Sequence, residues 1–203
     1  MTAQRIVLSE EEIINDSEIF KKLCNSFKEE EDRRSKIDGF ISANEEKIFT
    51  APASTRTEYH GAYIGGLVHH SLTVTKNLFE ISKIWGQDLE RDSLLFVGLF
   101  HDIGKSVTIK GEEQYIENHE KWKNERGIFY DYNPDIRDGL THAQRSVRLL
   151  SAYDIKMTDE EYLAILAHDG LYIDENISFK TKMNKLGLLL HWADMKTTFI
   201  DKK

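Results

Sequence analysis

The sequence predicts a single all-α domain, and three observations support this fold class. Apolar residues recur at helical spacing along several stretches, and the chain has only two prolines. Two capping boxes, Ser9 with Glu12 and Thr158 with Glu161, mark the starts of helices. A hydrophobic fraction of 40%, with 10% aromatic residues, is sufficient for a packed core in a chain of 203 residues.

Composition also limits the partners. The formal net charge is −8 and Lys and Arg form no long block, so polymeric nucleic acid is a disfavoured partner. A small anionic substrate stays compatible with this charge, because bound cations reverse the local potential. No stretch reaches the roughly 18 to 20 apolar residues of a membrane span, so we expect a cytoplasmic protein without a membrane partner. The sequence leaves homo-oligomerisation open.

The first predicted helix begins at Ser9 and carries apolar residues at helical spacing as far as Phe27. Its charged end, residues 27–39, should be solvated. The single cysteine, Cys24, is interpreted as a small core residue of this helix. Residues 37–58 then predict a short helical or irregular connection that ends in a loop.

The next predicted helix spans residues 62–85 and carries two adjacent histidines in different environments. His70 lies on the apolar face, so it should point into the core. His69 is rotated from it by about 100° and should face water. His60 begins this helical region, where packing or capping is the alternative to contact with a substrate.

Residues 89–103 are apolar almost all round, which is typical of the central helix of a bundle. His101 and Asp102 stand near its end, with Gly104 as the expected stop signal. Two metal-ligand side chains therefore lie at the mouth of a buried segment, where an unpaired charge is costly.

Residues 106–140 form a long polar segment that contains several aromatic residues. Loops of this length are commonly lids or binding loops. Its candidate substrate-binding residues are Lys121, Trp122, Lys123 and Tyr130, which could stack on a base and hold its phosphates. Packing in a small cluster of their own is the alternative for the same residues.

Three further helices are expected, over residues 141–153, 158–168 and 178–200. They contribute His142, His168 and Asp194. His191 lies one turn before Asp194 and could hydrogen-bond a ligand. Arg145, one turn after His142, could bind a phosphate or form a surface ion pair.

Six metal-binding side chains thus occupy core-facing positions or ends of predicted helices: His70, His101, Asp102, His142, His168 and Asp194. Any one of them alone is more often a packing or surface residue. Unpaired burial of all six would be prohibitive, and a shared metal site removes the conflict. Imidazoles mixed with carboxylates suit Mn, Fe, Co, Ni or Zn better than Mg, although Mg stays compatible. We expect one or two divalent ions.

The order of these residues resembles the HD-domain superfamily of metal-dependent phosphohydrolases. The similar segments are YHGAYIGGLVHHSL, LLFVGLFHDIGK, GLTHAQRSVRLL, MTDEEYLAILAHDG and LLLHWADMKTT. They resemble a branch of phage and bacterial proteins related to the HD domain of a bacterial 3′-to-5′ exoribonuclease. The resemblance covers roughly residues 50–198. It implies an HD-type helical bundle over residues 50–203 with the metal site in its core, and residues 1–49 as a helical segment that packs on it.

The resemblance also implies roles for individual residues. Four of them would hold one metal ion: His70, His101, Asp102 and Asp194. His142 and His168 would add ligands for a second ion, with the Asp102 carboxylate bridging both ions. Lys105 stands where the single-metal nucleotidase branch has a catalytic glutamate, and it resembles the lysine with which two-metal members reach a phosphate oxygen.

Around His168 the sequence departs in two ways from patterns found in other HD-domain proteins. The sequence continues DGLYIDEN instead of the GYP signature of cyclic di-GMP phosphodiesterases, so that substrate is not expected. Asp169 stands where relatives often carry another residue. It could tune the site or cap the helix, and we favour the helix cap.

We therefore expect an enzyme that hydrolyses a phosphoester or phosphoanhydride bond with a metal-activated water, with Asp102 and Lys105 as catalytic residues. A nucleotide or deoxynucleotide is the expected substrate. An exonuclease or a cyclic-nucleotide phosphodiesterase of the same fold is the enzymatic alternative. A non-catalytic HD module that binds a nucleotide and signals is the alternative from another class.

Overall fold

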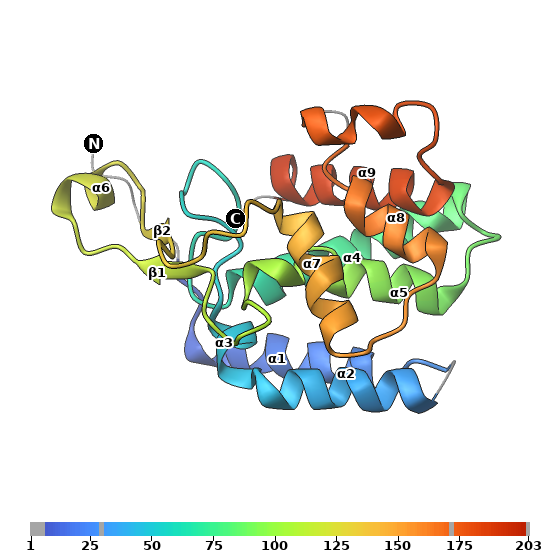
Figure 1. The fold of residues 1–203 in the computed structure, drawn as a ribbon, viewed down its shortest axis with the longest axis horizontal. Helices are drawn as coiled ribbons and strands as arrows, with labels where there is room; N and C mark the ends of the chain where they lie inside the picture. The colour runs from blue at the N-terminus through green and yellow to red at the C-terminus, as the bar shows by residue number, and fades with distance from the viewer. Residues whose placement is uncertain (1–6, 29–30, 171–172, 202–203) are drawn as a thin grey trace.

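The expected helices assemble into a bundle around one buried helix, as the computed structural model shows in Figure 1. The structure describes residues 7–28, 31–170 and 173–201. Over these residues it is helical apart from one two-stranded sheet, which confirms the predicted all-α class. In chain order the elements are α1 (Glu10–Cys24), α2 (Glu31–Ala43), α3 (Glu45–Thr50), α4 (Gly66–Trp85), α5 (Arg91–Phe100), the 3-10 turn η1 (Ile103–Lys105), β1 (Tyr115–Glu117), α6 (Lys121–Glu125), β2 (Tyr130–Tyr132), α7 (His142–Ala152), α8 (Asp159–Ala167), the 3-10 helix η3 (Asp174–Phe179) and α9 (Lys185–Phe199).

Helix α5 is the centre of the bundle because its apolar residues cover its whole circumference. Every residue from 94 to 100 is buried. The helix packs against α4, α8 and α9, and α4 also packs along α9. Each large side chain buried in this way contributes about 1.5 to 3 kcal/mol. The residues that follow α5 are therefore held at a fixed point in the middle of the molecule.

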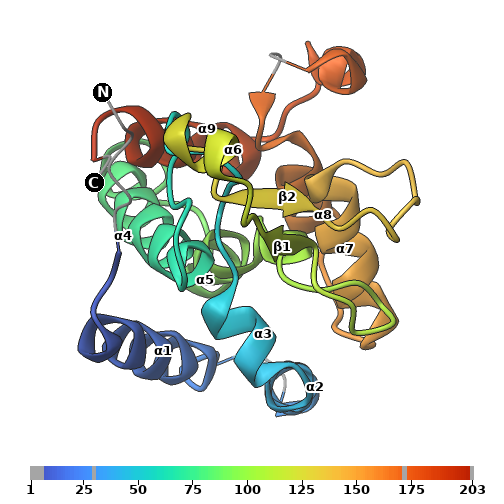
Figure 2. The same cartoon turned by 90° about the vertical axis from the view of Figure 1, so that its left-hand side faces the viewer.

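The N-terminal helices α1, α2 and α3 lie along one side of this bundle (Figures 1 and 2). The first predicted helix is divided in two, because α1 ends at Cys24 and α2 begins at Glu31. The expectation of a solvated stretch is wrong for α2, which buries Arg33, Ile37 and Phe40. Cys24 is buried, as expected for a core residue.

A buried ion pair explains why charged residues of α2 are not solvated. The Arg33 guanidinium donates to both carboxylate oxygens of Glu161 on α8, at 3.2 and 2.8 Å. Ser93 on α5 donates to the same carboxylate at 2.9 Å. The guanidinium also lies over the ring of Phe96, with 3.8 Å to its centroid. This group of side chains connects three helices that are distant in sequence.

Helix α4 begins at Gly66 and not at residue 62, because Gly61 and Gly65 adopt left-handed conformations with φ of 65° and 80°. His60 therefore lies in the loop before the helix. The expectation that His69 faces water is wrong. Its side chain is partly buried, and its Nδ1 lies 2.8 Å from a carboxylate oxygen of Asp16 on α1.

Residues 106–140 contain an antiparallel hairpin at one end of the bundle (Figures 1 and 2). Strand β1 pairs with β2 so that Tyr115 stands opposite Tyr132. Helix α6 lies in the connection between the two strands. Tyr115, Phe129 and Tyr130 form a hydrophobic cluster separate from the main core.

No helix among the described residues is long and apolar enough to cross a membrane. The cytoplasmic location stays a prediction from the sequence.

Candidate metal centre

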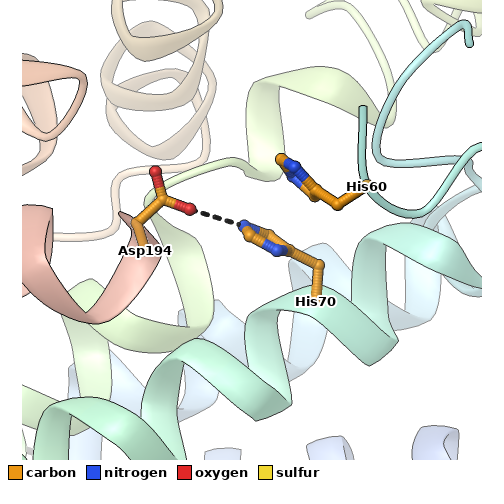
Figure 3. A group of neighbouring side chains, drawn as sticks. All are labelled: His60, His70 and Asp194. Atoms are coloured by element: carbon orange, nitrogen blue, oxygen red, sulfur yellow. Dashed lines mark ion pairs between the residues drawn. The ribbon is translucent and has the colours of Figure 1, made fainter. Parts of the chain in front are cut away.

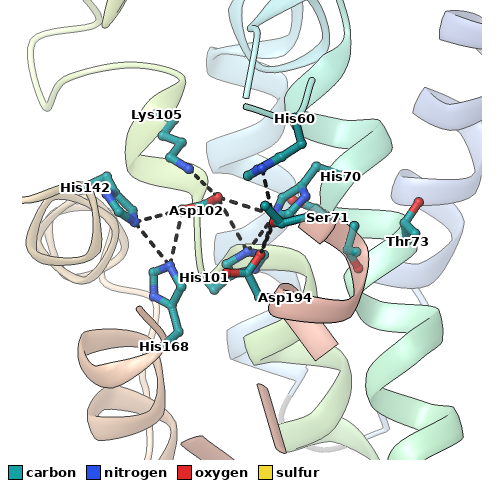
Figure 4. A network of polar contacts seen from close by, with 12 residues as sticks. His60, His70, Ser71, Thr73, His101, Asp102, Lys105, His142, His168 and Asp194 are labelled. Carbon is teal, nitrogen blue, oxygen red and sulfur yellow. Dashed lines mark hydrogen bonds and ion pairs between the residues drawn. The ribbon is translucent and has the colours of Figure 1, made fainter. Parts of the chain in front are cut away.

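The six candidate ligands converge in the middle of the bundle (Figure 4). His70 lies near the start of α4, His101 is the C-cap of α5 and is followed by Asp102, His142 is the first residue of α7, His168 is the C-cap of α8, and Asp194 lies on α9. Helix ends thus supply most of the side chains. The buried packing of α5 against its neighbours brings these ends together.

Asp102 lies between two pairs of imidazoles and turns one carboxylate oxygen toward each pair. Its Oδ2 is 3.6 Å from Nε2 of His70 and 3.5 Å from Nε2 of His101. Its Oδ1 is 3.4 Å from Nε2 of His142 and 3.5 Å from Nε2 of His168. The buried Oδ1 makes no hydrogen bond to any described residue. Such an oxygen requires a cation or a donor that the side chains alone do not supply.

Backbone carbonyls fix the tautomers of two of the imidazoles. Nδ1 of His101 lies 3.1 Å from the carbonyl oxygen of Gly98, and Nδ1 of His168 lies 2.7 Å from that of Ile165. A carbonyl only accepts, so each Nδ1 carries a proton and donates it. In the neutral rings each Nε2 then presents a lone pair to the centre, which is the arrangement of a metal ligand.

Facing ring nitrogens support the same interpretation. Nε2 of His70 and Nε2 of His101 are 3.2 Å apart, and so are Nε2 of His142 and Nε2 of His168. Together with Asp102, each pair forms a group whose ligand atoms could surround one metal ion. Imidazole nitrogens with a carboxylate are a suitable donor set for a divalent transition metal. The residues therefore fit a metal centre.

Asp194 and His60 extend the half of the centre that contains His70 (Figure 3). Oδ1 of Asp194 is 3.1 Å from Nε2 of His70. The ring of His60 stacks on that of His70 with a centroid distance of 4.1 Å, and its buried Nε2 has no partner among the described residues. These three residues form another group that could hold a metal ion. His60, expected at most to contact a substrate, thus stands at the centre itself.

The electrostatics of the cluster favour bound positive charge. Burial raises the pKa of Asp102, but Lys105 and the neighbouring imidazoles outweigh it and hold the pKa well below its usual range. Burial lowers the pKa of His101 to about 3. For His168 burial also acts to lower the pKa, but Asp169 and Asp102 raise it to about 9. The carboxylates around His168 thus favour a positive charge in this half of the centre.

Asp169, for which the sequence interpretation favoured a helix cap over a residue that tunes the site, lies at the centre. The C-cap of α8 is His168, and the Asp169 carboxylate turns toward the centre. Its Oδ2 is 3.1 Å from Nε2 of His142, and its Oδ1 is 3.8 Å from Nε2 of His168. The signal in the sequence was its position directly after a candidate ligand at a helix end. The half of the centre around His142 therefore has a carboxylate of its own.

Lys105 and Gly104 connect the centre to α7. Nζ of Lys105 donates to Oδ2 of Asp102 at 2.7 Å. Gly104 is not a simple helix stop, because η1 is pressed against α7 at this residue. A Cβ here would lie 2.4 Å from the backbone nitrogen of Ser146. The Gly104 N–H donates to the Ser146 hydroxyl at 2.9 Å.

A cavity of about 540 Å³ opens beside the centre. Lys105, His142 and Asp169 line it on the side of the centre. Arg145 also lines it, and the Arg145 guanidinium is paired with Asp138 at 2.9 Å. Of the two alternatives considered for Arg145, the ion pair is present, and binding of a phosphate stays a prediction.

The four residues expected in a lid do not line this cavity. Lys121 is exposed near Glu125. Trp122 is half exposed and donates from Nε1 to Glu120. The other two are Lys123, whose ammonium pairs with Glu120 and Asp131, and Tyr130, which is buried in the separate hydrophobic cluster.

His191 acts on the backbone near a candidate ligand. Its Nδ1 donates to the carbonyl oxygen of His168 at 2.7 Å. Gly170 makes room for this ring, because a Cβ at Gly170 would lie 2.5 Å from Cε1 of His191. The contact holds the end of α8, and with it the position of the His168 side chain.

The fold and the centre together define a class of protein: a helical bundle with a buried histidine and aspartate cluster that could hold a divalent metal ion. The HD domain family matches residues 67–194, which is more than half of the chain, and this chain belongs to that family. Membership of the HD domain family supports a metal-dependent phosphohydrolase and does not specify its substrate.

The chain is also similar to a dihydroneopterin 2′,3′-cyclic phosphate phosphodiesterase of Methanocaldococcus jannaschii. The two are 32% identical over 137 residues, which cover 65% of this chain and 47% of that protein. The chain thus spans about half the length of this relative. A comparison with solved structures finds no match.

Proposed function

We propose that this HD domain protein is a two-metal phosphohydrolase. The observation that carries the proposal is the position of Asp102, with one carboxylate oxygen facing His70 and His101 and the other facing His142 and His168. In this assignment Asp194 belongs to the first ion position. Asp102 is shared by both positions.

Divalent ions held here would supply Lewis acidity toward a water molecule and toward phosphate oxygens. The residues of the chain position the other participants. Lys105 holds Oδ2 of Asp102 and also lines the cavity, so its ammonium can stabilise charge that develops on a phosphoryl group. Arg145 adds a second cation to the same wall of the cavity. In the structure Lys105 is paired with Asp102 and Arg145 with Asp138, so a phosphate would share these cations with the two carboxylates.

The proposed substrate is a small phosphate ester, with a nucleotide or deoxynucleotide as the first candidate. A cavity of about 540 Å³ has the size of a small-molecule site. The relative from Methanocaldococcus jannaschii acts, by its name, on a 2′,3′-cyclic phosphate. This supports a cyclic phosphodiester as the second candidate substrate for this chain.

Two other functions are less well supported. The net charge of −8 disfavours an exonuclease that binds a long anionic strand. The lysine between the shared carboxylate and the open cavity favours a hydrolase over a non-catalytic nucleotide-binding module, because its ammonium can stabilise developing phosphoryl charge.

The test combines metal analysis with a substrate panel. Purified protein is analysed for bound metals and then incubated with Mn²⁺ and 5′-nucleotides, 2′,3′-cyclic nucleotides or single-stranded oligonucleotides. We expect two ions per chain and metal-dependent turnover of a mononucleotide or a cyclic nucleotide. Protein that binds no divalent ion and hydrolyses nothing in the panel would contradict the proposal. Turnover restricted to oligonucleotides would instead identify an exonuclease.

A further inference from the structure

The hairpin and the residues that flank its strands build part of the cavity wall. Gln114 precedes β1, Tyr115 and Tyr132 stand opposite each other on the two strands, and Asn133 follows β2; all four line the cavity. The rings of the tyrosines are 5.2 Å apart. Tyr115 is buried, whereas Tyr132 is 64% exposed. Tyr132 thus offers an accessible aromatic surface beside the cavity.

Gln114 combines burial with an unused donor. The residue is only 3% exposed, yet its side-chain Nε2 has no hydrogen-bond partner among the described residues. Its backbone is fixed on both sides, since its N–H donates to Ser106 at 3.1 Å and its carbonyl accepts from Asn133 at 2.9 Å. A buried donor without a partner is costly unless a water molecule or a ligand accepts its hydrogen bond, and a ligand in the cavity can do so.

The cavity lining combines two kinds of chemistry. Two cations line it, Lys105 and Arg145, and each is paired with a carboxylate, of Asp102 and Asp138 respectively. The lining also includes the amide of Gln114, an aromatic ring and apolar side chains such as Ile136 and Ile173. A molecule that matches both kinds of lining has a phosphate joined to a flat group that is largely apolar on its faces and polar on its edge.

We propose that Gln114 and Tyr132 determine substrate specificity by recognising a fused heterocycle of the purine or pterin kind. The ring stacks on Tyr132, and its edge pairs with the Gln114 amide, which offers a donor and an acceptor side by side. Adenine, guanine and pterin all present neighbouring donors and acceptors on one edge. This inference rests on the proposed function for the position of the phosphate, and it deepens that function by naming the substrate class.

The test measures binding separately from turnover. Isothermal titration with Mn²⁺ present compares GMP and AMP with ribose 5-phosphate, which has the phosphate and sugar but no base. We expect at least one of the two nucleotides to bind wild-type protein about tenfold more tightly than ribose 5-phosphate. Gln114→Met and Tyr132→Ala should each weaken binding of that nucleotide by about tenfold and leave binding of ribose 5-phosphate unchanged.

Ile116→Ala is the matched control, because Ile116 lies on β1 next to Tyr115 and does not line this cavity. It should leave the binding of all three probes unchanged. Tyr132 is largely exposed, so its variant remains informative even where Gln114→Met lowers stability. Wild-type protein that binds both nucleotides no more tightly than ribose 5-phosphate would overturn the inference, as would variants that weaken all three probes equally.

Hydrolysis of bis(p-nitrophenyl) phosphate distinguishes this inference from the proposed function. Selective nucleotide binding without any turnover of this ester or of the substrate panel would remove the hydrolase assignment and leave the recognition site in place. Turnover of the ester without selective nucleotide binding would keep the hydrolase assignment and remove the recognition site.

Discussion

At the scale of single residues, Asp102 is the side chain that the two halves of the centre share. Asp102→Asn keeps the size of the residue but removes the negative charge that faces four imidazoles. We expect it to lower metal content and to reduce activity by more than the roughly 10- to 100-fold that is typical for loss of a residue that only supports a ligand. Metal analysis and steady-state kinetics measure both effects.

His69→Ala is the control for this variant, because His69 lies next to His70 but pairs with Asp16 on α1. It should change neither metal content nor activity appreciably. If His69→Ala lost as much metal and activity as Asp102→Asn, then His69, and not His70, would be the metal ligand.

Asp169 tests whether the half of the centre around His142 is an ion position of its own. Its carboxylate is the only one besides Asp102 that lies within 4 Å of Nε2 of His142 among the described residues. Asp169→Asn should therefore reduce the metal content from two ions per chain toward one. Retention of both ions in the variant, measured by elemental analysis, would restrict Asp169 to a hydrogen bond with His142.

At the scale of elements, the pair between Arg33 and Glu161 connects α2 to α8 in a buried environment. Arg33→Met would leave the Glu161 carboxylate buried without its partner. We expect the free energy of unfolding to fall by about 3 kcal/mol, as is typical when one partner of a buried ion pair is removed. Chemical denaturation measures the change.

Two further variants control for this effect. The double variant Arg33→Met with Glu161→Gln should lose less stability than the sum of the two single variants, because it leaves no unpaired buried charge. Lys185→Ala removes an exposed pair with Asp88 and should leave the denaturation midpoint unchanged. Strict additivity in the double variant would mean that the two residues stabilise the protein independently.

Cys24 reports how firmly α1 packs on the bundle. Burial, with a smaller contribution from Asp38, raises the pKa of the Cys24 thiol, so the folded protein holds almost no thiolate at about pH 8. Iodoacetamide should therefore label native protein slowly and protein unfolded in urea rapidly. Rapid labelling of native protein, followed by mass spectrometry, would show that α1 opens on its own.

At the scale of the whole molecule, metal binding should be coupled to folding, because the ligands come together only in the folded chain. A ligand present at about 100 times its dissociation constant stabilises a fold by about 2.7 kcal/mol. For a chain of this size, chelation should then lower Tm by roughly 5 to 10 °C. Asp102→Asn should show a much smaller shift, and an equal shift would attribute the effect to a metal bound elsewhere.

Much of the helical bundle could be predicted because its signals are local. Capping boxes locate α1 and α8, helical spacing locates α7, and a fully apolar stretch identifies α5. The buried role of α2 could not be predicted, because Arg33 finds its partner 128 residues further along the chain. A charged run has the same appearance in the sequence whether or not such a partner exists.

Most residues of the metal centre could be predicted from the sequence, whereas those of the hairpin that line the cavity wall could not. The candidate ligands follow helix ends in a recognisable order, and the structure brings them together. The residues of the hairpin wall could not be found, because three-residue strands carry too little periodicity to reveal their register. Aromatic content alone therefore pointed to Trp122 and Tyr130, whereas the pairing of β1 with β2 places Tyr115 and Tyr132 beside the cavity.

The close approach of η1 to α7 at Gly104 has a consequence for how this centre can change. The distance between its two halves is set by main-chain contact, since there is no room even for a methyl group between Gly104 and the backbone of Arg145 and Ser146. This backbone contact thus fixes the position of η1, and of the neighbouring Asp102, relative to α7. Substitution of a side chain such as Asp169 should therefore change metal binding without changing the spacing between η1 and α7.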